Sequence, residues 1–287
     1  MKKVAIIGSN GQLGSDLVEA FKKQDVEVIG LTHDDIQIEN IDSVSNVLRS
    51  LAPGVILNTA AFHVAQKCED APDRAYAVNS QGALNVARLA QDLGALNVYF
   101  STDYVFDGTK GLPYVEQDLP NPLNVYGSTK LLGEFLTLNY SERSIVLRVS
   151  GIYGKVPCRA KGGNFITTML QKAKQQQEIS VVFDEIVSPT PTAEIAKRLP
   201  ALLGQEELGL FHLSTKGECS WFEFASTIFK TLKLSITVIP VSAKTFSSTI
   251  KRPAYSVLDT KRWKASHLKE MPHWKVALKK FLRSEYQ

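Results

Sequence analysis

The chain has 287 residues, of which 44% are hydrophobic and 22% charged, and its formal net charge is +4. This composition is typical of globular proteins and excludes disordered and fibrous classes. The basic residues are dispersed or at helical spacing, which predicts solvated helix faces rather than a nucleic-acid surface. No apolar stretch fits a signal peptide or membrane span, and Cys68, Cys158 and Cys219 form no zinc or disulfide pattern. We therefore expect a cytoplasmic protein with no metal, no membrane contact and no nucleic-acid partner.

Over the first 150 residues, short β-branched runs alternate with longer segments of helical periodicity. Strands are expected at 4–7, 26–31, 55–58, 96–100 and 145–149, and helices at 12–23, 72–93 and 124–140. Near-continuous hydrophobicity marks strands that are covered on both faces. The order therefore predicts an α/β fold with a Rossmann-type, doubly wound parallel sheet.

The pattern changes after Val149, where Gly and Pro interrupt the chain at 151–163 and 187–191. We expect a dinucleotide-binding domain over 1–150 and a smaller, mixed substrate-binding region over 151–287. Strands near 181–183 and 210–213 are expected to return to the first sheet, so the two regions are interleaved. The capping-box pattern from Ser220 to Glu223 predicts the start of a helix.

A glycine-rich turn directly follows the first strand and leads into a helix. Glycine permits positive φ and lets a pyrophosphate approach the amides of the helix N-terminus. A tight strand-to-helix connection also favours glycine, but the position of the turn favours a cofactor site. The residues expected to contact the cofactor here are Gly8, Asn10, Gly11, Gln12, Leu13 and Gly14. The G-x-x-G-x-x-G spacing resembles that of extended short-chain dehydrogenases/reductases.

The end of the second strand leaves the choice between NADPH and NADH open, with a slight preference for NADPH. It reads GLTH, so an acidic residue for the adenosine ribose is missing there, and Asp34 and Asp35 follow late. No Arg stands nearby for a 2′-phosphate. Small residues after the third strand, among them Ala60 and Ala61, lie where the cofactor would cross the sheet edge.

Tyr126 and Lys130 lie one helical turn apart in a predicted helix, so both side chains share one face. The ammonium could favour ionisation of the phenol and bind the nicotinamide ribose, whereas an accidental surface pair is the alternative. Thr102, at the end of the fourth strand, could hold a substrate carbonyl opposite the phenol. The chain order of glycine turn, Thr and Tyr/Lys favours the catalytic interpretation.

Five segments resemble the dTDP-4-dehydrorhamnose reductase family: STDYVFDG (101–108), NPLNVYGSTKLLGE (121–134), GGNF (162–165), SPTPT (188–192) and KRPAYSVLDT (251–260). The resemblance implies NAD(P)H-dependent reduction of a 4-keto sugar nucleotide, and a homodimer is a possible assembly. It implies that Thr102, Tyr126 and Lys130 are catalytic, and it adds Gln37 and Ile38 to the cofactor contacts. The implied substrate-binding residues are Thr102, Asp103, Tyr104, Gly151, Asn164, Phe165 and Arg252.

The chain departs from the family at Gly151, where a Trp usually packs on the sugar. We expect a wider pocket at this wall, unless Tyr153 or the 155–163 loop fills it. A 4,6-dehydratase would need an acidic residue where Tyr104 follows Asp103, so dehydration is disfavoured. The second alternative is a non-catalytic regulatory subunit similar to methionine adenosyltransferase β, which also lacks the Trp.

Overall fold

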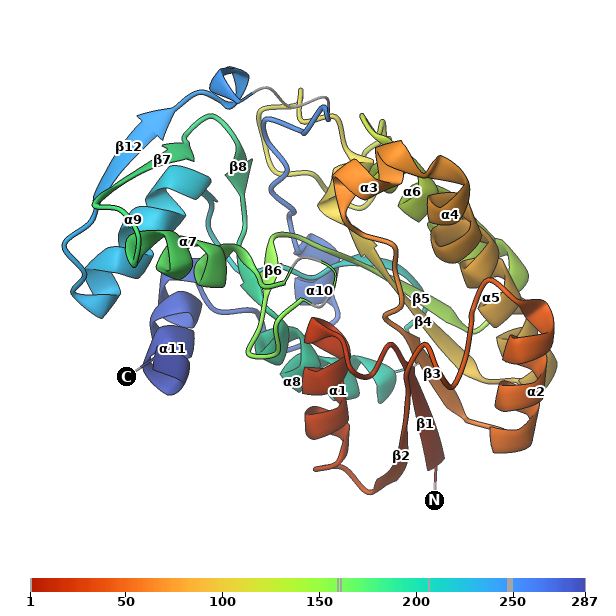
Figure 1. Ribbon diagram of the computed structural model, residues 1–287. Helices are drawn as coiled ribbons and strands as arrows, with labels where there is room; N and C mark the ends of the chain where they lie inside the picture. The colour runs from red at the N-terminus through yellow and green to blue at the C-terminus, as the bar shows by residue number, and fades with distance from the viewer. Residues whose placement is uncertain (1, 159, 161, 206, 247–249, 287) are drawn as a thin grey trace.

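Six parallel strands form the central sheet of the computed structural model, which describes residues 2–158, 160, 162–205, 207–246 and 250–286 (Figure 1). The strands are β1 (Lys2–Ile7), β2 (Val26–Leu31), β3 (Val55–Asn58), β4 (Leu96–Thr102), β5 (Ser144–Val149) and β10 (Gly209–His212). Their order across the sheet is β10-β5-β4-β3-β1-β2. Strands β3, β4 and β5 are buried along their whole length, as continuous apolar runs predict. The expected doubly wound parallel sheet is therefore confirmed.

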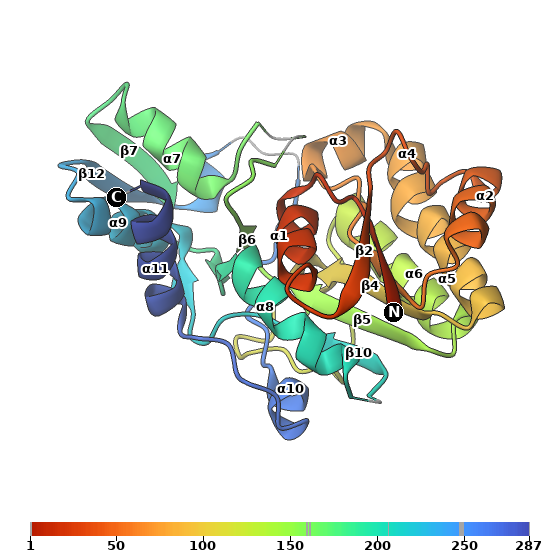
Figure 2. The same ribbon diagram turned by 90° about the horizontal axis from the view of Figure 1, so that it is seen from below.

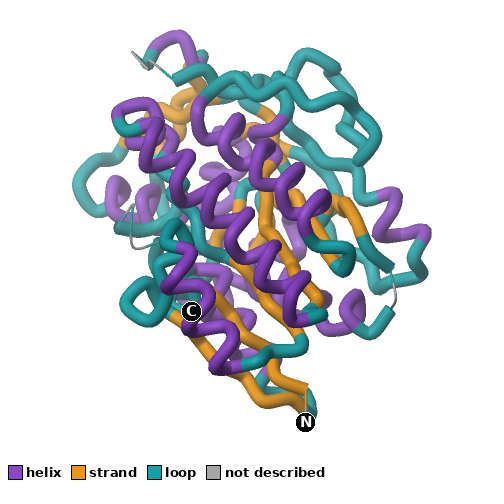
Figure 3. The backbone as a smooth tube through the Cα atoms, turned by 90° about the vertical axis from the view of Figure 1, so that its right-hand side faces the viewer, coloured by secondary structure: helices purple, strands orange, loops and turns teal. Residues whose placement is uncertain are grey.

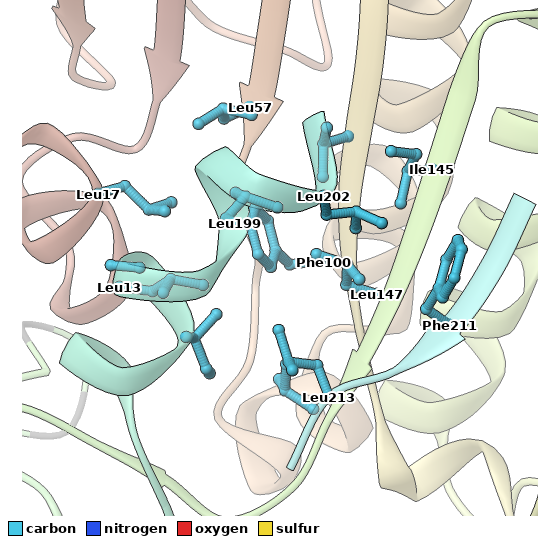
Figure 4. Close-up of a cluster of buried hydrophobic side chains, with 14 of the residues drawn as sticks. Leu13, Leu17, Leu57, Phe100, Ile145, Leu147, Leu199, Leu202, Phe211 and Leu213 are labelled. Carbon is cyan, nitrogen blue, oxygen red and sulfur yellow. The ribbon is translucent and has the colours of Figure 1, made fainter. Parts of the chain in front are cut away.

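Helices cover both faces of this sheet (Figures 2 and 3). They are α1 (Gln12–Phe21), α2 (Ile41–Leu51), α5 (Gly82–Leu93), α6 (Val125–Tyr140) and α8 (Thr192–Leu203). On one face Leu13 and Leu17 of α1 and Leu199 of α8 pack over Leu57 and Leu147 of the strands (Figure 4). On the other face the sheet packs against α2 and α5. The core thus fixes the carboxyl ends of the strands, where ligands bind in open α/β sheets.

The segment expected to be one helix at 72–93 is divided in the structure. After α3 (Ala65–Asp70) come α4 (Pro72–Tyr76), a π-helical turn (Ala77–Gln81) and then α5. The π-helical turn buries Asn79, whose side chain bonds to Phe62 and to the Thr129 hydroxyl. Such wide turns recur at functional sites, and this one ties the loop after β3 to α6.

The smaller lobe, at the left in Figure 1, is built around its own apolar cluster. Its elements are α7 (Phe165–Ala173), β7 (Glu178–Val182), α9 (Trp221–Leu232), β12 (Thr237–Val241) and α11 (Trp274–Tyr286), with the short strands β6 (Ile152–Tyr153), β8 (Ile186–Val187), β9 (Thr190–Pro191) and β11 (Cys219–Ser220). The Ser220 hydroxyl and the Glu223 carboxylate form the predicted capping box of α9. Helix α10 (Lys261–Ala265) packs back against β10 through the core residue Trp263.

One strand does not go where the sequence suggested. Residues 209–212 do pair with β5 in the central sheet, but the strand expected near 181–183 belongs to β7 and pairs with β12 in a separate sheet. The expectation for 181–183 was therefore wrong. The burial of β7 alternates along the strand, as in a sheet with one exposed face, because only one side meets the apolar cluster of the small lobe. The functional division of the chain near residue 150 stays a prediction.

Within the described ranges no helix is long and apolar enough to cross a membrane. In the same residues no group of three or more His, Cys, Asp or Glu side chains could hold a metal ion.

Candidate active site

The glycine turn between β1 and α1 closes on itself at the carboxyl edge of the sheet. Gly8 has a φ of +79°, and its carbonyl oxygen accepts a hydrogen bond from the Gly11 amide at 2.9 Å. A β-carbon on Gly14 would lie 2.1 Å from that same oxygen, so a larger residue would force the turn away from the helix. The first amides of a helix have no acceptor within it, so this cradle fits a pyrophosphate.

The other predicted residues of the turn present different groups. Asn10 is exposed, whereas Leu13 is buried in the core, so that only its backbone can face a cofactor. Gln12 joins the turn to the second lobe: its amide nitrogen donates to the Ile152 carbonyl, and its oxygen accepts from Asn164, both at 3.2 Å.

In the loop after β2, the Asp35 side chain forms hydrogen bonds within the loop itself. The Asp35 carboxylate accepts hydrogen bonds from the amide and hydroxyl of Thr32 at 2.8 and 2.7 Å, and these bonds lower its pKa. The Gln37 side chain donates to a backbone carbonyl of the same loop. Ile38 is buried, and its carbonyl accepts from Asn85 at 2.9 Å. The side chain and carbonyl of Ile38 therefore already make contacts within the protein.

The loop after β3 lies beside the glycine turn, as expected. A β-carbon on Gly8 would be 3.2 Å from the Ala60 amide nitrogen. The Ala61 carbonyl is 3.1 Å from Nδ1 of His63, and Nε2 of that ring is 3.0 Å from Sγ of Cys158. The structure thus brings Ala60, Ala61 and the glycine turn together at one edge.

Two short segments place Thr102 next to Tyr126. Thr102 ends β4, and its hydroxyl accepts the Tyr104 amide at 3.2 Å, which starts a tight 3₁₀ turn. Asn124 caps α6 by accepting the Gly127 amide at 2.8 Å, which fixes Tyr126 in the first helical turn. A β-carbon on Gly127 would be 2.2 Å from the Tyr104 carbonyl oxygen, so glycine allows helix and turn to touch.

The environment of Tyr126 keeps the phenol protonated. Burial raises the pKa of Tyr126 well above its ordinary value, and a hydrogen bond with the Thr102 side chain partly opposes this. The negative charge of Asp103 raises the same pKa further. The phenol is therefore protonated at neutral pH, with Thr102 beside it.

Lys130 does not pair with the phenol as expected from the helical spacing. Its Nζ lies 3.9 Å from the centroid of the Tyr99 ring, and only 2% of the residue is exposed. Burial lowers the pKa of Lys130 to about 7, although the Glu134 carboxylate opposes the shift. The amine thus titrates near neutrality, which suits a residue that exchanges protons.

The sequence did not reveal a buried ion pair between Glu134 of α6 and Arg148 of β5. Arg148 binds both carboxylate oxygens of Glu134, at 2.9 and 2.6 Å, and the Ser101 hydroxyl donates to the same carboxylate. The Arg148 guanidinium also lies 5.0 Å from the centroid of the Phe106 ring. Burial, together with the positive charge of Arg148, lowers the pKa of His212 to about 3, so this imidazole is neutral. Glu134 thereby links α6 to β4 and β5.

Three hydroxyls hold the Asp103 carboxylate. Thr102, Ser150 and Ser256 donate to it at 3.1, 3.0 and 2.6 Å. Burial raises the pKa of Asp103, and the hydroxyls oppose that shift. Only Thr102 is a neighbour in sequence, so the roles of Ser150 and Ser256 appear only once the chain is folded.

A cavity of about 880 Å³ opens beside this edge, and Phe165, Trp221, Glu185 and Arg252 are among its lining residues. Arg252 hydrogen-bonds the Tyr104 hydroxyl and attracts the Glu185 carboxylate. The Tyr104 ring meets the Tyr126 ring edge-on, with centroids 5.9 Å apart. Tyr104 thus connects the cavity with the phenol, and the predicted residues Phe165 and Arg252 lie on the cavity side.

The other two predicted substrate contacts, Asn164 and Gly151, are not among the residues found to line the cavity. Asn164 caps α7 and donates to Gln12 and to the Gly154 carbonyl, so its side chain faces the glycine turn. Gly151 has a φ of +52°, and a β-carbon there would be 3.6 Å from the Trp221 ring. Tyr153 does not fill this wall, because it is buried in the aromatic cluster of the small lobe.

Comparison with known proteins gives the family. The model of the RmlD substrate binding domain matches residues 1–287. A spore coat polysaccharide biosynthesis protein from Bacillus subtilis is 36% identical, and the alignment covers 99% of this chain and 98% of that protein.

Two solved structures agree. A dTDP-4-dehydrorhamnose reductase from Clostridium acetobutylicum has a TM-score of 0.94 and 35% identity, covering 98% of this chain and 99% of that one. A dTDP-4-dehydrorhamnose reductase from Bacillus anthracis, in complex with NADP, has a TM-score of 0.93 and 36% identity, covering 99% of both chains. The resemblance predicted from the motifs is thus confirmed, and the chain belongs to the dTDP-4-dehydrorhamnose reductase family.

Proposed function

We propose that this protein is an NAD(P)H-dependent oxidoreductase that reduces the 4-keto group of a sugar nucleotide. The substrate would be dTDP-4-dehydrorhamnose, giving dTDP-L-rhamnose, or a close analogue. The observation that carries the proposal is the position of Thr102 beside Tyr126 at the sheet edge, close enough to oppose the rise that burial causes in the pKa of the phenol, with the glycine cradle on one side and the Arg252 cavity on the other.

The glycine turn would hold the cofactor diphosphate on the first amides of α1, and Ala60 and Ala61 would border its path. NADPH or NADH supplies the hydride when bound. We favour NADPH, since Asp35 is already engaged by Thr32 and the related Bacillus anthracis structure contains NADP. Lys130, with its pKa of about 7, would bind the ribose and carry a charge when a partner oxygen approaches.

Tyr126 would donate its phenolic proton to the carbonyl oxygen as that oxygen gains negative charge. The Thr102 hydroxyl would orient the same oxygen, because it already lies within hydrogen-bonding reach of the phenol. In the structure Thr102 donates its single hydroxyl proton to Asp103, so it would turn that proton from Asp103 to the keto oxygen when the substrate binds. Arg252 offers a fixed fork of donors for the substrate diphosphate, and Phe165 an apolar surface beside it.

The test is oxidation of NADPH and NADH, followed by absorbance, against a panel of 4-keto sugar nucleotides. Reduction of dTDP-4-dehydrorhamnose supports the proposal, and no reduction of any member contradicts it. No finding favours the regulatory-subunit alternative, which such a negative result would bring forward.

The remaining expectations belong to this proposal. We expect action in the cytoplasm, in keeping with Cys68, Cys158 and Cys219, which are buried and form no disulfide bond with one another. We also expect a sugar nucleotide and no nucleic acid as partner, and a homodimer as the assembly to test by light scattering.

A further inference from the structure

The indole of Trp221 occupies the wall that Gly151 leaves open. The ideal β-carbon position of Gly151 is 3.6 Å from the Trp221 ring and 3.2 Å from the Pro189 Cα. With its φ of +52°, Gly151 is in a conformation that side-chain-bearing residues rarely adopt. The positive φ accounts for glycine at this position, and the Gly151 backbone lies beside the ring of a residue 70 positions further along the chain.

Beside Gly151, this indole is connected through neighbouring residues to Thr102. Gly151 directly follows Ser150, whose hydroxyl donates to Asp103 at 3.0 Å. Asp103 in turn accepts from Thr102, which ends β4 opposite Val149 of β5. A series of contacts through Gly151, Ser150 and Asp103 therefore connects the Trp221 ring with the hydroxyl that would orient the keto oxygen.

The indole also lies near the charged end of the cavity. Burial raises the pKa of the Glu185 carboxylate, whereas the Arg252 guanidinium and the Trp221 indole both lie close enough to lower it. The ring is half-buried and lies against Phe165, with centroids 4.7 Å apart and planes at 32°. Trp221 thus extends from the group suited to a diphosphate toward the group suited to a ketone, and a hexose connects those two moieties in a sugar nucleotide.

We infer that Trp221 is the residue that determines which hexose is accepted, by presenting its indole as a platform to the sugar ring. An indole offers a large, rigid apolar surface, and the rings of Phe165 and Phe224 pack against this one. This inference rests on the proposed function. It differs from our expectation of a widened pocket, because an aromatic wall is present but comes from α9.

Ligand binding without turnover tests this directly. The probes are dTDP-L-rhamnose and dTDP alone, titrated calorimetrically into the wild type, Trp221→Leu and Phe222→Leu. Phe222 is the matched control: it is the next residue on α9 and packs against the same apolar cluster, but it is outside the cavity lining found among the described residues. Trp221→Leu should weaken dTDP-L-rhamnose binding about tenfold or more and leave dTDP binding unchanged. Phe222→Leu should change neither.

Equal weakening of both ligands by Trp221→Leu would mean that the indole contacts the nucleotide, and it would overturn the inference, as would no weakening at all. A wild type that binds neither probe overturns the proposed function, and this inference with it. If Trp221→Leu fails to fold, the wild-type fluorescence decides. Trp263 and Trp274 are each 1% exposed, so Trp221 is the indole that reports on the cavity. A larger emission change with dTDP-L-rhamnose than with dTDP supports the inference, and equal changes refute it.

Discussion

The hydroxyl of Ser256 donates a hydrogen bond to the Asp103 carboxylate at 2.6 Å, although 153 residues separate them in the chain. This contact attaches the segment that carries Arg252 to the turn that carries Thr102. The groups that we propose for substrate binding and for catalysis are thereby held at a fixed distance from each other.

Ser256→Ala should destabilise the fold by about 1–3 kcal/mol, because the buried carboxylate loses a donor. Urea denaturation monitored by circular dichroism measures the loss. Ser284→Ala is the control, since that hydroxyl bonds only within the exposed end of α11. Equal midpoints for the two variants would show that the Asp103 contact adds nothing to stability.

Tyr126→Phe should keep cofactor binding nearly intact and lower turnover by roughly 10² to 10⁴, the range for loss of a general acid. The Thr102 hydroxyl remains, so substrate affinity should change little. Steady-state rates, combined with fluorescence titration of NADPH, separate the two effects. Turnover at the parent rate would mean that another group supplies the proton.

Lys130→Met should stabilise the protein most at low pH. Burial lowers the pKa of Lys130 to about 7 in the folded state, whereas the unfolded chain keeps the ordinary value of 10.5. Below pH 7 the wild type must bury a charged amine, and this cost fades as the pH rises from 7 toward 10.5. The difference in unfolding free energy between variant and wild type should therefore shrink over that window.

The same Lys130→Met variant should bind cofactor more weakly and turn over more slowly, since it loses the ribose contact. A difference in unfolding free energy that stays constant from pH 6 to 10 would instead show that Lys130 titrates outside this range.

Gly14→Ala should abolish NADPH binding, because its β-carbon would lie 2.1 Å from the Gly8 carbonyl oxygen. Gly11→Ala should be milder, since the corresponding distance is 3.1 Å, whereas a bulky residue at Gly11 should block the cofactor. Gly204→Ala is the control, because its nearest neighbour would be 3.5 Å away. Binding is measured by NADPH fluorescence. Unchanged affinity in Gly14→Ala would argue against the turn as the diphosphate site.

Short sequence patterns correctly predicted many of the helices and strands of this protein. Apolar runs located the central strands, and the Ser220–Glu223 pattern located the start of α9. The assignment of 181–183 to the central sheet was wrong, because a short apolar run does not say which partner strand it will meet.

In the candidate site, too, the sequence predicted some of the residues and not others. Motifs identified the glycine turn, Thr102 and Tyr126, which the structure brings to one sheet edge, although their roles stay predictions. The contacts of Trp221 with Gly151 and of Ser256 with Asp103 join segments far apart in the chain, so no spacing rule could have found them. The position of Lys130 over Tyr99 depends on the burial of both.

The π-helical turn at Ala77–Gln81 has a consequence for how this site can vary. A π-helical turn is wider than an α-helical one, and here the Asn79 carbonyl accepts a hydrogen bond from the Tyr99 hydroxyl at 2.9 Å. The ring on which Lys130 rests is thus anchored by a main-chain atom, which every amino acid possesses. The anchor therefore depends on the number of residues in this stretch rather than on their identity: exchanges of side chains would preserve it, whereas losing or gaining a single residue would displace it.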